Sequence, residues 1–93
     1  MERMPMDSIV LNGASVRDRA AALDAFAPYF PDYYGRNLDA LWDCLTDFSG
    51  AMEIRFVNCA ALRANLGPFW DQLQMVLEKA REENPLLSVI IEN

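Results

Sequence analysis

Histidine is absent from this 93-residue sequence, and its absence excludes several kinds of chemistry. Without an imidazole there is no Ser-His or Cys-His nucleophile pair, no histidine-ligated zinc and no side-chain proton shuttle that titrates near neutral pH. The remaining candidates for catalysis are carboxylates, two thiols, three tyrosines and one lysine. A catalytic role would have to rest on these groups, and we expect neither a metal nor a cofactor.

Long apolar runs are also missing. No stretch approaches the roughly 18 residues that a membrane span needs, and residues 1–7 lack the apolar core of a secretory signal. We therefore expect a cytoplasmic protein. The two cysteines, Cys44 and Cys59, show no CxxC or zinc-type spacing, and their apolar neighbours favour buried reduced thiols over a disulfide.

Basic residues are outnumbered, because 8 Lys and Arg stand against 14 Asp and Glu, for a formal net charge of −6. Such a protein repels phosphate backbones and anionic lipid, so we expect a basic partner and no direct binding to nucleic acid or membranes. The length allows one domain, which we assign to 1–93. Its 53% hydrophobic and 24% charged residues are typical of a globular protein.

Hydrophobic patterns predict strands that alternate with helices. Three apolar runs predict strands at 8–11, 52–57 and 86–91, of which the first is expected to be buried. Helices are predicted between them at 16–26, 38–48, 59–66 and 68–83. The expected N-caps are Ser15, which begins a capping-box pattern, Asn37 and Asn58, while Pro68 opens the longest helix. This order predicts an α/β fold, a three-stranded parallel sheet with right-handed crossovers packed with about four helices.

The helix predicted at 38–48 separates apolar residues from acids. At about 100° per residue, one stripe holds Leu38, Leu41, Leu45 and Phe48. Asp39, Asp43 and Asp47 follow one another on the other side at four-residue spacing, with Thr46 beside them. Each neighbouring pair of like charges costs a few tenths of a kcal/mol, and Asp47 lies near the negative end of the helix dipole. The row therefore has no local stabilising explanation.

Two interpretations of the acidic row remain open. It is either a solvated face that happens to be acidic or a binding surface. Trp42 borders the row and Tyr33 and Tyr34 precede it, and aromatic residues beside charges are typical of binding hot spots. For Trp42 alone, burial at the edge of the core is an acceptable alternative.

An enzymatic interpretation is less favoured. Asp39 and Asp43 could act as a carboxylate pair in hydrolysis, or bind a hard cation such as Mg²⁺. Adjacent turns of a helix place both acids on a convex surface open to water, whereas carboxylate catalysis needs a cleft and one perturbed pKa.

Residues 33–46 read Tyr-Tyr-Gly-Arg-Asn-Leu-Asp-Ala-Leu-Trp-Asp-Cys-Leu-Thr. This segment closely resembles the signature of the barstar family, intracellular inhibitors of barnase and related extracellular ribonucleases. The resemblance implies a barstar-like fold and a bacterial, non-enzymatic protein. Its partner would be a basic extracellular-type ribonuclease or related toxin, bound 1:1 by a protein that is monomeric when free.

The resemblance also implies how the partner is bound. The helix and its preceding loop would enter the nuclease active site and mimic bound RNA. Asp43 would be the main anchor, in the place of a substrate phosphate, paired with the nuclease's arginines and catalytic histidine. The partner-binding residues implied in this way, together with Asp47 from the acidic row, are Tyr33, Asn37, Leu38, Asp39, Trp42, Asp43, Thr46 and Asp47.

Several positions depart from the family pattern. Asp47 stands in place of a glycine and Phe48 in place of a tryptophan, while Arg36 and Lys79 stand in place of acids. A positive residue at the rim of the surface would repel a barnase-like nuclease. The alternative function is therefore a barstar-like interaction module whose basic partner is not a ribonuclease.

Overall fold

The computed structural model of the protein describes residues 6–48 and 50–92. Within these residues the elements, in chain order, are β1 (Met6–Asn12), α1 (Arg19–Asp24), the 3₁₀ helix η1 (Ala27–Tyr29), α2 (Leu38–Asp47), β2 (Ala51–Val57), α3 (Cys59–Leu66), α4 (Pro68–Glu83) and β3 (Leu87–Ile91). All strand pairs of the sheet are parallel. The predicted α/β fold, with three parallel strands and four α-helices, is confirmed.

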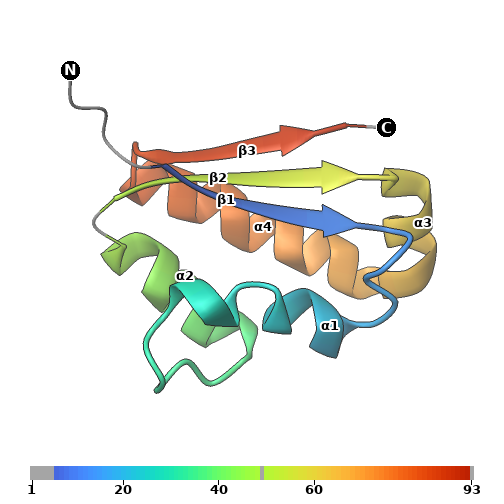
Figure 1. The fold of residues 1–93 in the computed structure, drawn as a ribbon, viewed down its shortest axis with the longest axis horizontal. Helices are drawn as coiled ribbons and strands as arrows, with labels where there is room; N and C mark the ends of the chain where they lie inside the picture. The colour runs from blue at the N-terminus through green and yellow to red at the C-terminus, as the bar shows by residue number, and fades with distance from the viewer. Residues whose placement is uncertain (1–5, 49, 93) are drawn as a thin grey trace.

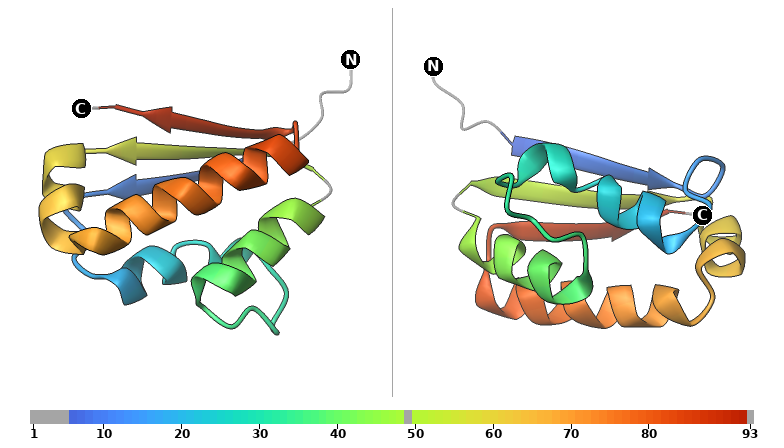
Figure 2. Two further views of the ribbon diagram at one scale, coloured as in Figure 1. Left: turned by 180° about the vertical axis from the view of Figure 1, so that it is seen from behind. Right: turned by 90° about the horizontal axis from the view of Figure 1, so that it is seen from below.

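The strand order, β1-β2-β3, determines where the helices lie. Each crossover advances by one strand in the same direction, and right-handed crossovers of this kind place their helices on the same face of the sheet. Figures 1 and 2 show α1, α2 and α4 against one face and α3 at the end of the sheet where β1 and β2 finish. The opposite face is left without a helix in the described part of the chain.

The strands are consequently buried on one side only. In β1, Ile9 and Leu11 are 3% and 0% exposed, but Val10 between them is 52% exposed. Arg55 and Ile90 are paired with Val10 across the sheet and share its face. The prediction of a buried strand at 8–11 is therefore wrong for this outer face, because both crossovers cover the other one.

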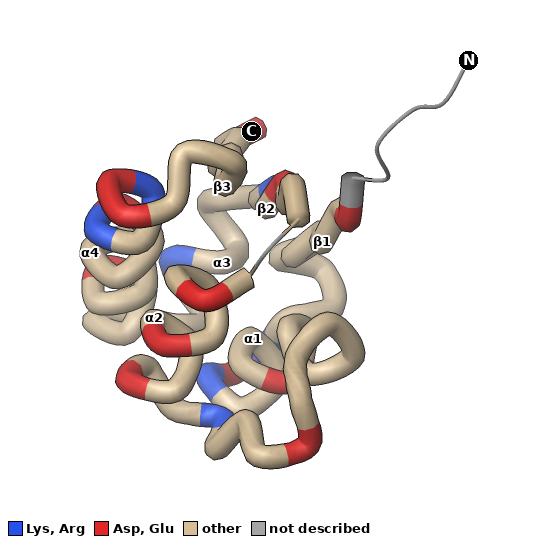
Figure 3. Tube along the Cα trace, turned by 90° about the vertical axis from the view of Figure 1, so that its left-hand side faces the viewer, with Lys and Arg blue, Asp and Glu red and all other residues tan. Residues whose placement is uncertain are grey.

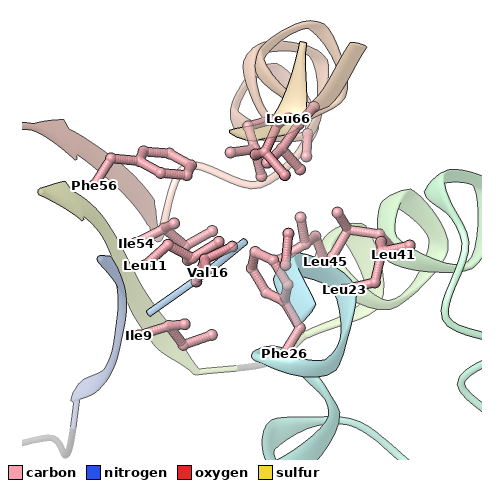
Figure 4. Close-up of a cluster of buried hydrophobic side chains, with 14 of the residues drawn as sticks. Ile9, Leu11, Val16, Leu23, Phe26, Leu41, Leu45, Ile54, Phe56 and Leu66 are labelled. Carbon is pink, nitrogen blue, oxygen red and sulfur yellow. The ribbon is translucent and has the colours of Figure 1, made fainter. Parts of the chain in front are cut away.

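The core lies between the sheet and the helices. Figure 4 shows strand side chains meeting those of α1, α2 and the segments beside them: Ile9, Leu11, Val16, Leu23, Phe26, Leu41, Leu45, Ile54, Phe56 and Leu66. Full burial of an aliphatic or aromatic side chain of this size contributes roughly 1.5–3 kcal/mol. Cys44 and Cys59 are buried free thiols, which confirms the expectation of no disulfide between them.

The first helix begins later and ends earlier than predicted. Asp18, and not Ser15, is its N-cap, because the Asp18 carboxylate accepts a 2.8 Å hydrogen bond from the Ala21 amide. The Ser15 amide instead donates to the Asn12 carbonyl in the turn that follows β1. Pro28 lies inside η1, where its fixed φ fits a tight turn, so the segment continues as a 3₁₀ helix after α1 has ended at Asp24.

The bounds of the other helices and strands agree closely with those predicted from the sequence. Helix α2 ends at Asp47, one residue before the predicted end, and β3 begins at Leu87. The Asn58 side chain does not cap α3; its Nδ2 instead donates a 2.6 Å hydrogen bond to Asn12 Oδ1, and its backbone is left-handed (φ 55°). Pro68 opens α4 as predicted. Neither α4 nor any other helix among the described residues is long and apolar enough to span a membrane.

Candidate functional site

Helix α2 is held firmly at its start and along its apolar side. Asn37 caps it as predicted, with Oδ1 accepting a 2.8 Å hydrogen bond from the Ala40 amide. Leu41 and Leu45 are fully buried, and Cys44 is buried beside them. Burial of these residues fixes which side of the helix faces solvent, and that side carries the acids.

Asp39, Asp43 and Asp47 are all exposed on that outer side of α2. The acidic positions follow one another along the helix in Figure 3. Successive turns place them about 6 Å apart along the axis. The ion pairs of the described residues involve Asp24, Glu53, Glu78 and Glu92, and none of these three aspartates. The acidic row therefore presents uncompensated negative charge to solvent.

The two tyrosines before α2 lie in opposite environments. Tyr33 is 75% exposed, whereas Tyr34 is 5% exposed and its hydroxyl donates 2.9 Å to the Leu23 carbonyl. Burial, followed by the influence of Cys44, raises the pKa of Tyr34 well above its usual range. Tyr34 is thus a core residue that ties the loop to α1, and Tyr33 is the tyrosine available to a partner.

A first surface hollow, of about 230 Å³, separates the loop before α2 from the helix itself. It is lined by Tyr29, Phe30, Pro31, Tyr33, Asp43, Cys44, Asp47 and Phe48. Two of the acids thereby share a concave surface with Tyr33. We did not predict Tyr29, Phe30 and Pro31 as lining residues, because nothing in their local pattern shows that the chain turns back over α2.

A second hollow, of about 410 Å³, lies between α2 and α4. It is lined by Leu38, Asp39, Trp42, Gln72, Met75, Val76 and Lys79. Trp42 is 37% exposed and Met75 61% exposed, so the hollow has a large apolar component. Gln72 and Met75 were not anticipated from the sequence, although the exposed face of a helix that packs beside α2 is where such residues occur.

Asn37 and Thr46 are partly engaged within the protein. The Asn37 carbonyl oxygen serves the helix cap, and the Thr46 hydroxyl donates to the Trp42 carbonyl at 2.9 Å and lies 3.1 Å from the Asp43 carbonyl. Asn37 is exposed, and Thr46 and Leu38 are half-buried. All eight predicted residues thus lie on α2 or on the loop before it, with Leu38 and Asp39 at one hollow and Tyr33, Asp43 and Asp47 at the other.

Arg36 has a different environment from the one its sequence position suggests. Its backbone is left-handed (φ 54°), and its Nε lies 2.8 Å from Asp24 Oδ1 at the end of α1. Both side chains of this ion pair are more than half exposed, so the pair adds little stability. The Asp24 carboxylate therefore compensates the positive charge of Arg36.

The exposed side chains of α2 and the loop before it are suited to binding a partner. The acids of α2 are exposed to water, and no group of three or more Cys, Asp or Glu side chains converges on a possible metal site within the described residues. Burial, followed by the charges of Asp43 and Asp47, raises the pKa of the Cys44 thiol. This thiol is consequently neutral at physiological pH and poorly suited to act as a nucleophile.

The fold and the site define a small α/β protein that exposes one acidic helix beside aromatic residues. A family model described as Barstar (barnase inhibitor) matches residues 6–91. The chain belongs to the barstar family, as its resemblance over 33–46 implied. It is 46% identical over 55 residues to a Bacillus subtilis (strain 168) protein named "Putative ribonuclease inhibitor YrdF". That match covers 58% of this chain and 60% of the relative, which is less than two thirds of the relative's length.

Proposed function

We propose that this protein is a non-catalytic inhibitor of a barnase-type ribonuclease, which it blocks by placing the outer face of α2 and the preceding loop in the nuclease active site. The observation that carries the proposal is the acidic row of Asp39, Asp43 and Asp47, exposed on successive turns and outside the ion pairs of the described residues. Membership of the barstar family and the name of the Bacillus relative support it.

Electrostatics explains why such a face suits a ribonuclease. An active site that binds the phosphates of RNA is basic, and carboxylates can take the place of those phosphates. Asp43 lies in the middle of the row and lines the first hollow, so we assign it the role of main anchor. The long-range attraction between opposite charges also speeds the encounter of the two proteins.

Preorganisation supports the same assignment. The cap at Asn37 and the buried side chains of Leu41 and Leu45 hold α2 in one orientation before any partner binds. A binding surface that is already ordered loses less conformational entropy on association. The carboxylates therefore require little rearrangement to meet a rigid basic site.

A second candidate function is binding to a basic protein that is not a ribonuclease. Lys79 and the exposed Met75 in the second hollow favour it, because a positive charge at the rim opposes a uniformly basic partner. Such a partner would carry an acidic or neutral group opposite Lys79.

Residual ribonuclease activity, measured with increasing inhibitor, tests the proposal. We expect a panel of barnase-type nucleases to include enzymes whose activity is lost at a 1:1 ratio. Asp43→Ala and Glu92→Ala each remove one negative charge, but Glu92 lies beyond β3 and pairs with Arg55. Only Asp43→Ala should weaken inhibition. If every nuclease of the panel stays fully active, the second candidate replaces the first.

A further inference from the structure

Asn84 occupies an unusual position at the junction of α4 and α2. It follows the last residue of α4 and precedes Pro85, and it is 7% exposed. Among the described residues it is the one buried residue that carries a side-chain amide. A buried amide is costly unless all its hydrogen-bonding groups are used, so its partners show what it does.

Both ends of the Asn84 side chain are hydrogen-bonded. Nδ2 donates to the Leu45 carbonyl at 2.9 Å and to the Phe48 carbonyl at 3.2 Å, and Oδ1 accepts from the Leu86 amide at 3.1 Å. Leu45 is in the last turn of α2 and Phe48 is its C-cap. Carbonyls at the end of a helix have no partner within that helix. Asn84, which lies just after α4, thus supplies a C-terminal cap to α2.

Two bonds to one helix end constrain more than one bond does. A single hydrogen bond allows α2 to pivot, whereas bonds to the carbonyls of Leu45 and Phe48 also resist rotation about the helix axis. Asp47 lies between these two residues in the sequence, and Asp43 lies about one turn before Asp47. For a carboxylate about 6 Å from the axis, a rotation of about 10° is a displacement of about 1 Å. Binding groups need to be held within about 0.5 Å of their productive positions.

The choice of asparagine also preserves the charge of the surface. Lysine or arginine could donate to the same carbonyls, but their positive charge would oppose the field of Asp43 and Asp47. Glycine, a common residue after a helix, has no side-chain donor. A neutral amide satisfies the end of α2 and leaves the acidic row uncompensated.

We propose that Asn84 is a positioning residue of the docking surface: its amide locks the last turn of α2 in the rotation that directs Asp43 and Asp47 toward the partner. This inference rests on the proposed function. It assigns a role in binding to a buried residue that is not expected to touch the partner.

Asn65 of α3 provides a matched control. Its Nδ2 also donates to two backbone carbonyls, those of Gly13 and Val16, each at 3.1 Å, but these lie in the turn after β1 and not in α2. Asn84→Ala and Asn65→Ala therefore remove the same number of side-chain-to-backbone donations. A loss of stability common to both variants cannot by itself account for a difference in binding.

The experiment compares the two variants with the wild type by titration with barnase and by residual dipolar couplings of the α2 amides, at a temperature where all are folded. We expect Asn84→Ala to change the couplings of α2 and to raise the Kd by about tenfold or more, chiefly through faster dissociation. Asn65→Ala should change neither. Asn84→Ser, which keeps one donor, should fall between wild type and alanine, and it replaces the alanine variant if that variant does not fold.

Three results would overturn the inference: unchanged couplings in the Asn84 variants, equal effects of the Asn84 and Asn65 substitutions, or a reoriented α2 that binds barnase normally. Failure of the wild type to bind barnase or any related nuclease would instead refute the proposed function. The dipolar couplings would then decide by themselves whether Asn84 positions α2.

Discussion

Lys79 of α4 and Asp39 of α2 line the same surface hollow, together with the partly exposed Trp42. Arg36, the other residue that reverses an expected charge, pairs with Asp24. The two departures from the family pattern are therefore not equivalent. Lys79 borders the surface proposed to meet a partner, whereas the charge of Arg36 is compensated within the protein.

Specificity is expected to respond to Lys79 more than to Arg36. Lys79→Glu should increase the association rate with barnase by up to about tenfold at low salt, because it replaces a like charge at the rim by an opposite one. Arg36→Glu should help less, since it places a second acid beside Asp24. Stopped-flow association at low and high salt measures both. If Lys79→Glu brings no gain at low salt, partner choice depends on other positions, with Asp47 and Phe48 the next to examine.

Association should be fast at low ionic strength and slow steeply as salt is added. The acidic row of α2 attracts a basic site over a distance set by the Debye length, which is about 8 Å at 0.15 M salt. Association rates measured from low salt to about 0.15 M salt check this expectation. The variant Glu92→Ala, altered just after β3 and outside the acidic row, serves as the control and should keep the salt dependence. An association rate that does not change with salt concentration would contradict docking steered by charge.

Binding and folding should separate on the two faces of α2. Asp43→Ala should weaken binding by about 2 kcal/mol or more, and should raise stability by a few tenths of a kcal/mol through relief of repulsion along the helix. Leu41 is fully buried, so Leu41→Ala should cost about 2–5 kcal/mol of stability with little direct effect on contacts. Urea unfolding and titration calorimetry of both variants test this. An Asp43→Ala protein that unfolds, or that binds normally, would contradict the assignment of Asp43.

The stability of the folded protein should fall as the pH rises into the alkaline range. Burial raises the pKa of Cys44 above 9.0 and that of Tyr34 above 10.0, so the folded protein keeps protons that the unfolded chain releases. The stabilisation is complete below about pH 9 and is lost as pH rises, by up to about 1.4 kcal/mol per pH unit for each group.

Tyr34→Phe isolates the contribution of the tyrosine to this alkaline loss. The substitution should cost about 1 kcal/mol near neutral pH, because the hydrogen bond from the tyrosine hydroxyl to the Leu23 carbonyl is lost, but stability should decline less steeply above pH 10. Urea unfolding from pH 7 to 11 measures both effects. A slope identical to that of the wild type would show that Tyr34 does not titrate differently in the folded and unfolded states.

Local sequence determined much of this protein. The order of strands and helices, the cap at Asn37 and the opposite placement of Leu41 and Asp43 on α2 were all predicted correctly. These features depend on periodicity and on hydrogen bonds between residues two to four positions apart, which a sequence displays directly. The error at Ser15 is of the same local kind, since Asp18 offers a competing cap three residues later.

Tertiary structure decided the rest, because it depends on which distant segments meet. Val10 is exposed because both crossovers cover the other face of the sheet. The path of the loop before α2 buries Tyr34 and exposes Tyr33. Two features link residues about 40 positions apart. One is the hollow that Lys79 shares with Asp39, and the other is the pair of hydrogen bonds from Asn84 to the end of α2. No local pattern encodes such a meeting, since it arises only when α4 packs beside α2 against the same face of the sheet.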